Sequence, residues 1–321
     1  MNLTTTKRPL ITLGISCFNA EKTIARAIES ALNQSWENKQ IIVVDDASDD
    51  SSVTIIKEFI KLHGIIKLHV NEDNLGVAAV RNKIIEHSKG EFIAFFDDDD
   101  SSEYDRVERQ YNRIVEYSKK WHCDKPIICH TARRVVYGEG ISLTERTIGC
   151  NLDSLAPYGV NVASRILLGS RLVDGYGSMA TCSQMGSAKV YAEVGGFDEN
   201  LRRSEDTELN IRLALSGCHF IGIGSPLVTQ YITKSEDKNF EIEYESTLYY
   251  VNKYKDFITR HSSYRFVKSW VNLKFIFYKK NYFLFLIKFI VLFFQYPVLS
   301  TRRMFLSIPN FQINRRFGNN R

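Results

Sequence analysis

The stretch GEFIAFFDDDD, residues 90–100, decides the fold class of this chain. Its apolar part, Phe92–Phe96, is typical of a strand buried on both faces of a parallel sheet. Four aspartates follow directly, and such a cluster stays fully ionised only beside a cation. Mg²⁺ and Mn²⁺ prefer oxygen ligands, so we predict a divalent metal site at the carboxyl end of a central strand. A solvated acidic turn that caps the next helix is the competing interpretation.

On either side of this stretch, strand-length apolar runs alternate with amphipathic segments of helical spacing. The expected strands are Leu10–Ser16, Gln40–Val44, Ile65–Val70 and Phe92–Phe96, and the expected helices are Glu21–Asn33, Ser51–His63, Val77–His87 and Glu103–Ser118. Strands that alternate with helices of this length indicate βαβ units and a parallel sheet with helices on its faces.

From Lys125 onward the pattern is less regular. We predict strands at Pro126–Val136, Met179–Ser187, Cys218–Ile223 and Leu227–Ile232, helices at Lys189–Val194 and Asp206–Ser216, and only helices beyond Phe240. The segment Tyr137–Tyr176 is rich in Gly, Ser and Asn, and so long an irregular stretch predicts a functional loop.

Charge is distributed unevenly along the 321 residues. The net charge is +5, but residues 257–321 carry twelve Lys or Arg and no Asp or Glu, and removing that +12 leaves −7 for residues 1–256. An acidic body with a basic tail predicts an anionic partner for the tail. Six cysteines without a CxxC pair argue against a zinc site and a disulfide framework, and fit a reducing, cytoplasmic compartment.

Five short motifs follow one another in a characteristic order. They are Ile15–Asn19, Val43–Asp50, Asn74–Val77 with Arg81-Asn82, Asp97–Asp99, and Gly195–Glu199 with Glu205-Asp206. Together they resemble the family 2 glycosyltransferases, nucleotide-sugar transferases of the GT-A fold, over about Leu10 to Ile232. The family usually has Tyr at Phe18 and Gly at Ala47, within its VDDGSxD motif.

The resemblance implies a mostly parallel central sheet of the GT-A type, flanked by helices, with a helical C-terminal extension. The catalytic domain is then expected over residues 1–240, with a nucleotide-sugar half at about 1–125 and an acceptor half at about 126–240. Residues 241–321 form the helical, basic and hydrophobic extension.

Three residues at the ends of the first two strands, Ser16, Phe18 and Asp46, are predicted to bind the nucleotide-sugar. The Phe18 ring offers a face for a base, and Asp46 could accept the imide N–H of uracil. Core packing is the alternative for Phe18, and a turn role is the alternative for Asp46. Arg81 could bind diphosphate or pair with an acid of the cluster, and a plain surface arginine is the competing account.

In the family, the outer acids of the DxD motif contact the ribose and the metal, which implies Asp97 for the nucleotide-sugar and Asp99 for Mn²⁺ or Mg²⁺. Asp98 is also assigned to the nucleotide-sugar, although its role and that of Asp100 stay open because every position is Asp.

The family's general base corresponds to Asp206, expected to deprotonate the acceptor hydroxyl. Glu205 is expected to hold the acceptor. Both acids begin a helix, where capping and the helix dipole alone could explain them. No QxxRW motif follows, which favours transfer of a single sugar.

The C-terminal segment Phe266–Leu299 is aromatic and aliphatic. Its purest part, Tyr282–Leu299, has 18 residues, at or below the ~20 needed to span a bilayer. Polar residues recur every seven positions, at Lys274, Asn281, Lys288 and Gln295, which on one helix would form a narrow polar line. We therefore favour a helix in the plane of an anionic membrane surface over a core or oligomer helix and over a true span.

These features predict an inverting, metal-dependent glycosyltransferase that moves one sugar from a nucleotide-sugar, expected to be a UDP-sugar, to a glycan or lipid-linked glycan. We expect it at the inner face of a bacterial cytoplasmic membrane, in capsule or lipopolysaccharide synthesis, without a nucleic-acid partner. One alternative is a nucleotidyltransferase, which would need a Gly-rich loop where this chain has CFNAEKT. Another is a non-catalytic sugar- or Ca²⁺-binding module, which would leave Asp206 and Arg81 without a role.

Overall fold

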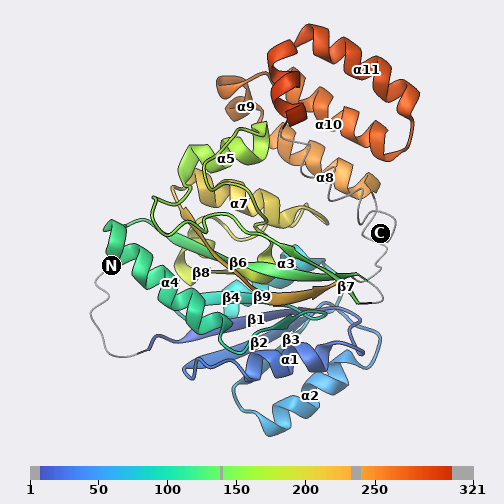
Figure 1. The fold of residues 1–321 in the computed structure, drawn as a ribbon. Helices are drawn as coiled ribbons and strands as arrows, with labels where there is room; N and C mark the ends of the chain where they lie inside the picture. The colour runs from blue at the N-terminus through green and yellow to red at the C-terminus, as the bar shows by residue number, and fades with distance from the viewer. Residues whose placement is uncertain (1–7, 138–139, 233–239, 306–321) are drawn as a thin grey trace. The chain divides into compact units, whose positions relative to one another are not determined.

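The structure is a computed structural model that describes residues 8–137, 140–232 and 240–305. The chain divides into two compact units, residues 1–162 with 172–233 and residues 163–171 with 234–321. The first unit contains the sheet, and the second contains the C-terminal helices (Figure 1). The functional division that we predicted at residue 240 stays a prediction.

One nine-stranded sheet forms the first unit, in the order β3-β2-β1-β4-β8-β6-β9-β5, with β7 paired to β6. The strands are β1 (Ile11–Cys17), β2 (Lys39–Asp45), β3 (Ile66–Val70), β4 (Phe92–Asp97), β5 (Ser101–Ser102), β6 (Ile127–Tyr137), β7 (Ile141–Glu145), β8 (Gln184–Ser187) and β9 (His219–Tyr231). Strands β3, β2, β1 and β4 are parallel, and β8 runs antiparallel to both β4 and β6. The predicted fold class, a mostly parallel GT-A-type sheet flanked by helices, is confirmed.

Helices cover both faces of this sheet. They are α1 (Ile24–Leu32), α2 (Ser52–Leu62), α3 (Val77–His87), α4 (Arg106–Trp121), α6 (Ala188–Glu193) and α7 (Glu205–Leu215), with a 3₁₀ turn η1 (Thr181–Ser183). Helix α5 (Gly159–Leu168) begins in the first unit, and most of it belongs to the second. The odd-numbered side chains of β1 are fully buried in a core shared with α1, α2 and α4. On the opposite face, a Cβ at Gly14 would lie 2.3 Å from Ile84 of α3, so glycine lets that helix approach the strand.

Three predictions for the less regular half need correction. Tyr137–Tyr176 is not wholly irregular, because it contains β7 and α5. The two strands expected over 218–232 are one strand, β9, whose register with β6 shifts near Pro226. That shift accommodates Pro226, which lies in the gap between the two expected strands. The strand expected at Met179–Ser187 is η1 followed by the short β8.

The second unit, called the C-terminal unit here, contains most of α5 together with α8 (Phe240–Lys253), α9 (Lys255–His261), α10 (Tyr264–Tyr278) and α11 (Tyr282–Gln295), with further helix over 297–305. The apolar segment is therefore two helices and not one. Lys280 has a positive φ of 59°, and the Asn281 side chain caps α11 by accepting a hydrogen bond from the Leu284 N–H at 3.2 Å. The seven-residue polar line is thus wrong, because only Lys288 and Gln295 share a helix. Within the described residues, no helix has the length and apolarity needed to cross a membrane.

Candidate active site

The four aspartates form a turn after β4, beside the carboxyl end of β1, and several segments of the first unit hold this turn. The Asp98 carboxylate accepts a hydrogen bond from the Phe18 N–H at 2.8 Å. The Asp100 carboxylate accepts one from the Tyr231 N–H at 3.2 Å. The β1–α1 loop and the last residue of β9 are therefore both fixed by acids of the same turn.

Arg26 of α1 supports the same turn. Its guanidinium donates to the backbone carbonyl of Asp99 and lies over the Tyr231 ring, 4.1 Å from the ring centre. A cation stacked on an aromatic face and bonded to a carbonyl of the turn fixes the backbone that carries the acids. We did not predict these contacts of Arg26.

Burial and mutual repulsion oppose full ionisation of the acids. Burial, together with the charges of Asp99 and Asp97, raises the pKa of Asp98 to about 8. Burial and the same two neighbours raise the pKa of Asp100 well above its ordinary value. A divalent cation would relieve this repulsion, which is the physical reason to look for a metal site here.

Asp97, Asp100 and Cys182 each place one ligand atom within 4.8 Å of the others. Asp100 Oδ2 is buried without a hydrogen-bond partner among the described residues, and such an oxygen is suited to bind a cation. Burial raises the pKa of the Cys182 thiol, so it stays protonated and is a poor ligand for a hard cation. The two carboxylates therefore fit a divalent ion. Asp99 lies outside this group, and its assignment as the metal ligand stays a prediction.

Arg81 of α3 joins this turn to the start of α7. Its guanidinium donates to Asp97 at 2.9 Å and to Glu205 at 2.6 Å, and all three side chains are largely buried. Burial opposes the charge of Arg81, but the two carboxylates outweigh it and hold its pKa above the ordinary value. Arg81 is therefore not a plain surface residue. A contact with diphosphate stays a prediction.

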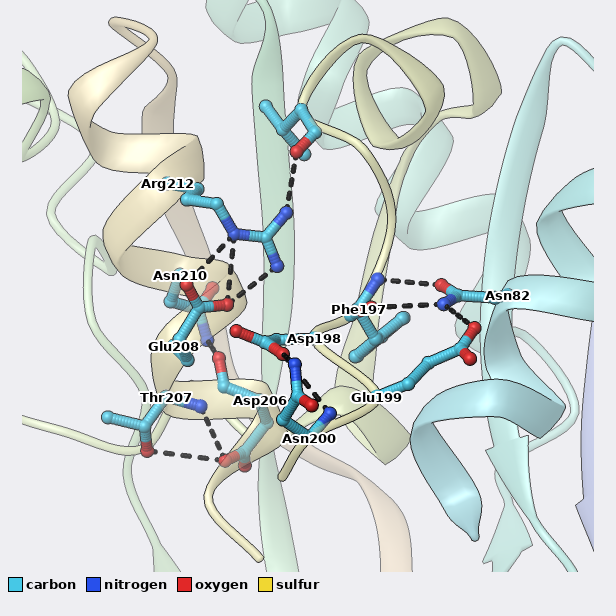
Figure 2. Close-up of polar contacts among 11 residues, drawn as sticks. Asn82, Phe197, Asp198, Glu199, Asn200, Asp206, Thr207, Glu208, Asn210 and Arg212 are labelled. Carbon is cyan, nitrogen blue, oxygen red and sulfur yellow. Dashed lines mark hydrogen bonds and ion pairs between the residues drawn. The ribbon is translucent and has the colours of Figure 1, made fainter. Parts of the chain in front are cut away.

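Asp206 lies next to Glu205 in the first turn of α7 and is half-buried. Its Oδ1 accepts hydrogen bonds from the N–H and the hydroxyl of Thr207, at 2.6 and 3.2 Å (Figure 2). Asn210, one turn later, donates to the backbone carbonyls of Asp206 and Met179 at 2.8 and 2.9 Å. The backbone that carries Asp206 is thus tied to the segment before η1, and Asn210 is a positioning residue that we did not predict.

The side chain of Asn82, on α3, forms hydrogen bonds that fix the turn Gly195-Gly196-Phe197. Its side-chain oxygen accepts from the Phe197 N–H at 2.6 Å, and its nitrogen donates to the Phe197 carbonyl at 3.0 Å and to Glu199 at 2.7 Å (Figure 2). Gly196 has a φ of 66°, and a Cβ there would lie 2.3 Å from the Asn82 oxygen. Two motifs more than a hundred residues apart are therefore joined by hydrogen bonds from one side chain, that of Asn82.

Asp46 lies at the end of β2 and is buried. Its Oδ1 accepts from Asn71 at 2.7 Å and from the Leu75 N–H at 3.0 Å, and its Oδ2 accepts from the Gly76 N–H at 2.7 Å. These bonds are the turn role that we considered as an alternative. They occupy three of about four acceptor positions of a carboxylate. The contact with uracil stays a prediction.

Ser16 and Phe18 lie nearby on β1 and on the loop after it. The Ser16 hydroxyl is buried and has no hydrogen-bond partner within the described residues, so it is available to form a hydrogen bond with a ligand. The Phe18 side chain is 46% exposed, which fits a stacking surface better than core packing. The structure brings the first, second and fourth motifs to one edge of the sheet.

Two fully or largely buried arginines lie behind the acids. Arg106 of α4 donates to the Phe95 carbonyl and to Ser102, both at 2.9 Å, and burial lowers its pKa to about 10. Arg133 of β6 contacts Glu145, the Ser178 hydroxyl and the Cys182 thiol. Charges on helices usually lie on solvated faces, so the sequence gave no signal for an inward Arg106.

An open α/β sheet with an acidic turn beyond a central strand, joined through a buried arginine to a second acidic motif, defines a GT-A-type protein. Residues 12–132 match the model of glycosyl transferase family 2. This part of the chain therefore belongs to family 2 of the glycosyltransferases.

Individual relatives match over limited lengths. An uncharacterized glycosyltransferase of Haemophilus influenzae is 38% identical over 108 residues, which are 34% of this chain and 43% of the relative. The putative teichuronic acid biosynthesis glycosyltransferase TuaG of Bacillus subtilis is 33% identical over 111 residues, 35% of this chain and 44% of the relative. The chain thus spans less than half the length of either relative.

Among solved structures, S. aureus TarS 1–349 in complex with UDP-GlcNAc superposes with a TM-score of 0.55. The sequence identity is 16%, over 75% of this chain and 66% of that structure. At this identity the likeness establishes the fold and not the ligand.

Proposed function

We propose that this chain is an inverting glycosyltransferase that moves one sugar from a UDP-sugar to a hydroxyl of a glycan acceptor. The observation that carries the proposal is the double ion pair of Arg81, which joins Asp97 of the acidic turn to Glu205, the neighbour of Asp206. One side chain thereby links the turn where we place the donor to the start of α7, which carries the proposed base Asp206.

On the donor side, Phe18 would stack on the base, and Ser16 and Asp46 would hydrogen-bond to the nucleoside. Asp97 and Asp100 fit Mn²⁺ or Mg²⁺, as the unsatisfied Asp100 oxygen supports, with Asp99 as the ligand implied by the resemblance. A bound divalent ion supplies positive charge against the diphosphate as UDP leaves. Asp98 would also contact the nucleotide-sugar.

On the acceptor side, Asp206 would take the proton of the acceptor hydroxyl. That oxygen forms the new bond to the anomeric carbon as the bond to UDP breaks, and the electron pair of the broken bond leaves with UDP. A single displacement inverts the anomeric configuration. Glu205 is proposed to contact the acceptor, and its ion pair with Arg81 would fix its position.

The biological setting is also a proposal. The assignment of TuaG to teichuronic acid biosynthesis supports cell-surface polysaccharide synthesis, and the ligand of the TarS structure makes UDP-GlcNAc the first donor to test. Whether a hexose or an N-acetylhexosamine is moved then follows from a donor panel. We further propose that the basic, apolar C-terminal unit attaches to the anionic inner face of the cytoplasmic membrane, where a lipid-linked acceptor would lie.

The test is a panel of UDP-sugars incubated with Mn²⁺ or Mg²⁺, with UDP release measured as the product. We expect one donor to give metal-dependent UDP release that chelator stops. Release of pyrophosphate from UTP and a sugar 1-phosphate would instead identify a nucleotidyltransferase. Failure of every nucleotide-sugar to bind or turn over would refute the transferase and favour a binding module.

A further inference from the structure

A cavity of about 540 Å³ lies within the C-terminal unit, between the first half of α10 and the end of α11. Two basic residues, Arg265 and Lys268, line it together with two amides, Asn272 and Gln295. The remaining lining residues are a serine and two tyrosines, all with hydroxyl groups. The volume is within the usual range for a small-molecule site.

The chemistry of the lining is that of an anion site. No carboxylate lines the cavity, and no ion pair to Arg265 or Lys268 is found in the described part of the chain. The Asn272 oxygen accepts a hydrogen bond from the Tyr244 hydroxyl at 2.7 Å, which leaves the amide nitrogen to donate. Two cations and several donors fit a group with several acceptor oxygens and negative charge, such as a phosphate.

An exposed apolar face adjoins this cavity. Side chains at 283, 287, 290 and 294 recur every three or four residues along α11, and Phe283 and Phe294 are 78% and 79% exposed. The opposite side of α11 packs on α10, where Leu292 is buried. Phe294 directly precedes Gln295, which lines the cavity, so the apolar face ends next to one wall of the cavity.

An apolar face of this extent on a soluble domain marks an interaction site. A free phosphate or nucleotide would use the cavity but would leave the exposed rings in water. A bilayer lipid supplies a phosphate and an apolar layer at adjacent depths. Residues 257–321 contain twelve basic and no acidic residues, which suits an anionic bilayer and not a neutral one.

We propose that the cavity between α10 and α11 takes the phosphate of an anionic phospholipid headgroup, while the exposed face of α11 enters the apolar layer. The inference deepens the proposed membrane attachment and rests on it, but it does not depend on sugar transfer. Arg265 and Lys268 would bind the headgroup as a specific site and not only as part of a diffuse positive field.

The experiment is flotation of the full-length chain with vesicles of phosphatidylglycerol and phosphatidylcholine, compared with phosphatidylcholine alone. The pocket variant is Arg265→Gln with Lys268→Gln. The matched control is Arg260→Gln with Lys280→Gln, which removes the same charges from exposed positions outside the cavity. A thermal melt of each variant checks folding, and donor hydrolysis without vesicles checks the catalytic unit separately.

We expect the wild-type chain to float with the anionic vesicles only. The pocket variant should lose about 30-fold in partition, since each engaged basic residue contributes on the order of 1 kcal/mol. The control variant should lose less than about fivefold. Donor hydrolysis by the soluble protein should be the same for both variants, so its loss in the wild type would count against the transferase and not against this site.

Equal losses for the two variants would overturn the site and leave only diffuse attraction. Absence of wild-type flotation with anionic vesicles would overturn the membrane partner. A second arm adds inorganic phosphate at constant ionic strength. If phosphate stabilises the wild type but not the pocket variant, and flotation with anionic vesicles is unchanged when phosphate is present, the cavity is a site for a free anion and the lipid assignment fails.

Discussion

Replacing Arg81 with Met should expose how strongly the site depends on one guanidinium. The substitution keeps the length of the apolar stem and removes the charge that pairs with Asp97 and Glu205. Glu205 is 8% exposed, so it would be left as an unpaired buried carboxylate. Breaking a buried pair from one side costs about 3–5 kcal/mol. Asp97 retains 24% side-chain exposure and can be solvated in part, so we expect the lower end, about 3 kcal/mol.

The pH dependence of this loss can be worked out from Glu205. Burial already raises its pKa above the ordinary value of 4.5, and Arg81 is the group that lowers it. Without Arg81 the pKa rises further, and the folded protein prefers the protonated acid. The penalty is therefore absent below about pH 4.5 and grows as the pH rises through the folded pKa. The variant should be closer to wild type in mild acid than above pH 7.

Urea unfolding at pH 5 and pH 8 measures this directly. Adding Glu205→Gln to Arg81→Met removes the stranded charge, so the double variant should regain at least 1 kcal/mol at pH 8. Glu205→Gln alone provides the third corner of the cycle. Additive effects in this cycle, or an Arg81→Met loss below about 0.5 kcal/mol, would refute the pairing as a determinant of stability.

Three further predictions concern the chemistry and the motif turns. Asp206→Asn should lower transfer by roughly 10²–10⁴-fold with nearly unchanged donor affinity, measured by product formation and by UDP-sugar titration; weakened donor binding with normal turnover would place Asp206 elsewhere. Asp100→Asn should weaken Mn²⁺ binding in the presence of UDP by more than about tenfold in calorimetry, and Asp99→Asn should do the same if it is the ligand implied by the resemblance. Gly196→Ala should cost about 2 kcal/mol or more in urea unfolding because of its φ and the Asn82 contact, whereas Gly195→Ala, with open space around its Cβ, should cost about 1 kcal/mol.

The parallel half of the sheet was predictable because its strands are buried on both faces. Such strands appear in the sequence as continuous apolar runs, and Phe92–Phe96 corresponds to β4 with one residue added. The mixed half was less predictable, since β9 contains Gly, Ser and Pro at its bulge and owes its continuity to pairing with β6. Local composition indicates that the strand ends there, and only the pairing with β6 makes β9 one continuous strand.

In the C-terminal unit, the apolar run alone could not reveal where one helix ends. The segment Lys279-Lys280-Asn281 contained the signal for a helix boundary, since Asn is a preferred residue at the N-cap of a helix. The seven-residue spacing of polar residues, from which we predicted one helix, does not show this boundary. The exposed apolar face survives this correction because it lies on α11 alone.

The motif residues themselves could be chosen from the sequence, but their partners could not. Arg81 and Glu205 are 124 positions apart, and nothing local states that they meet. The four acids seemed to require a cation in order to coexist, yet the fold already places the positive charges of Arg106 and Arg133 behind them. That compensation is incomplete, because the pKa of Asp98 is still raised to about 8 and Asp100 keeps an unsatisfied oxygen. Buried arginines therefore balance part of the charge of the acidic turn, and a divalent ion would favour the ionised form of the remaining acids.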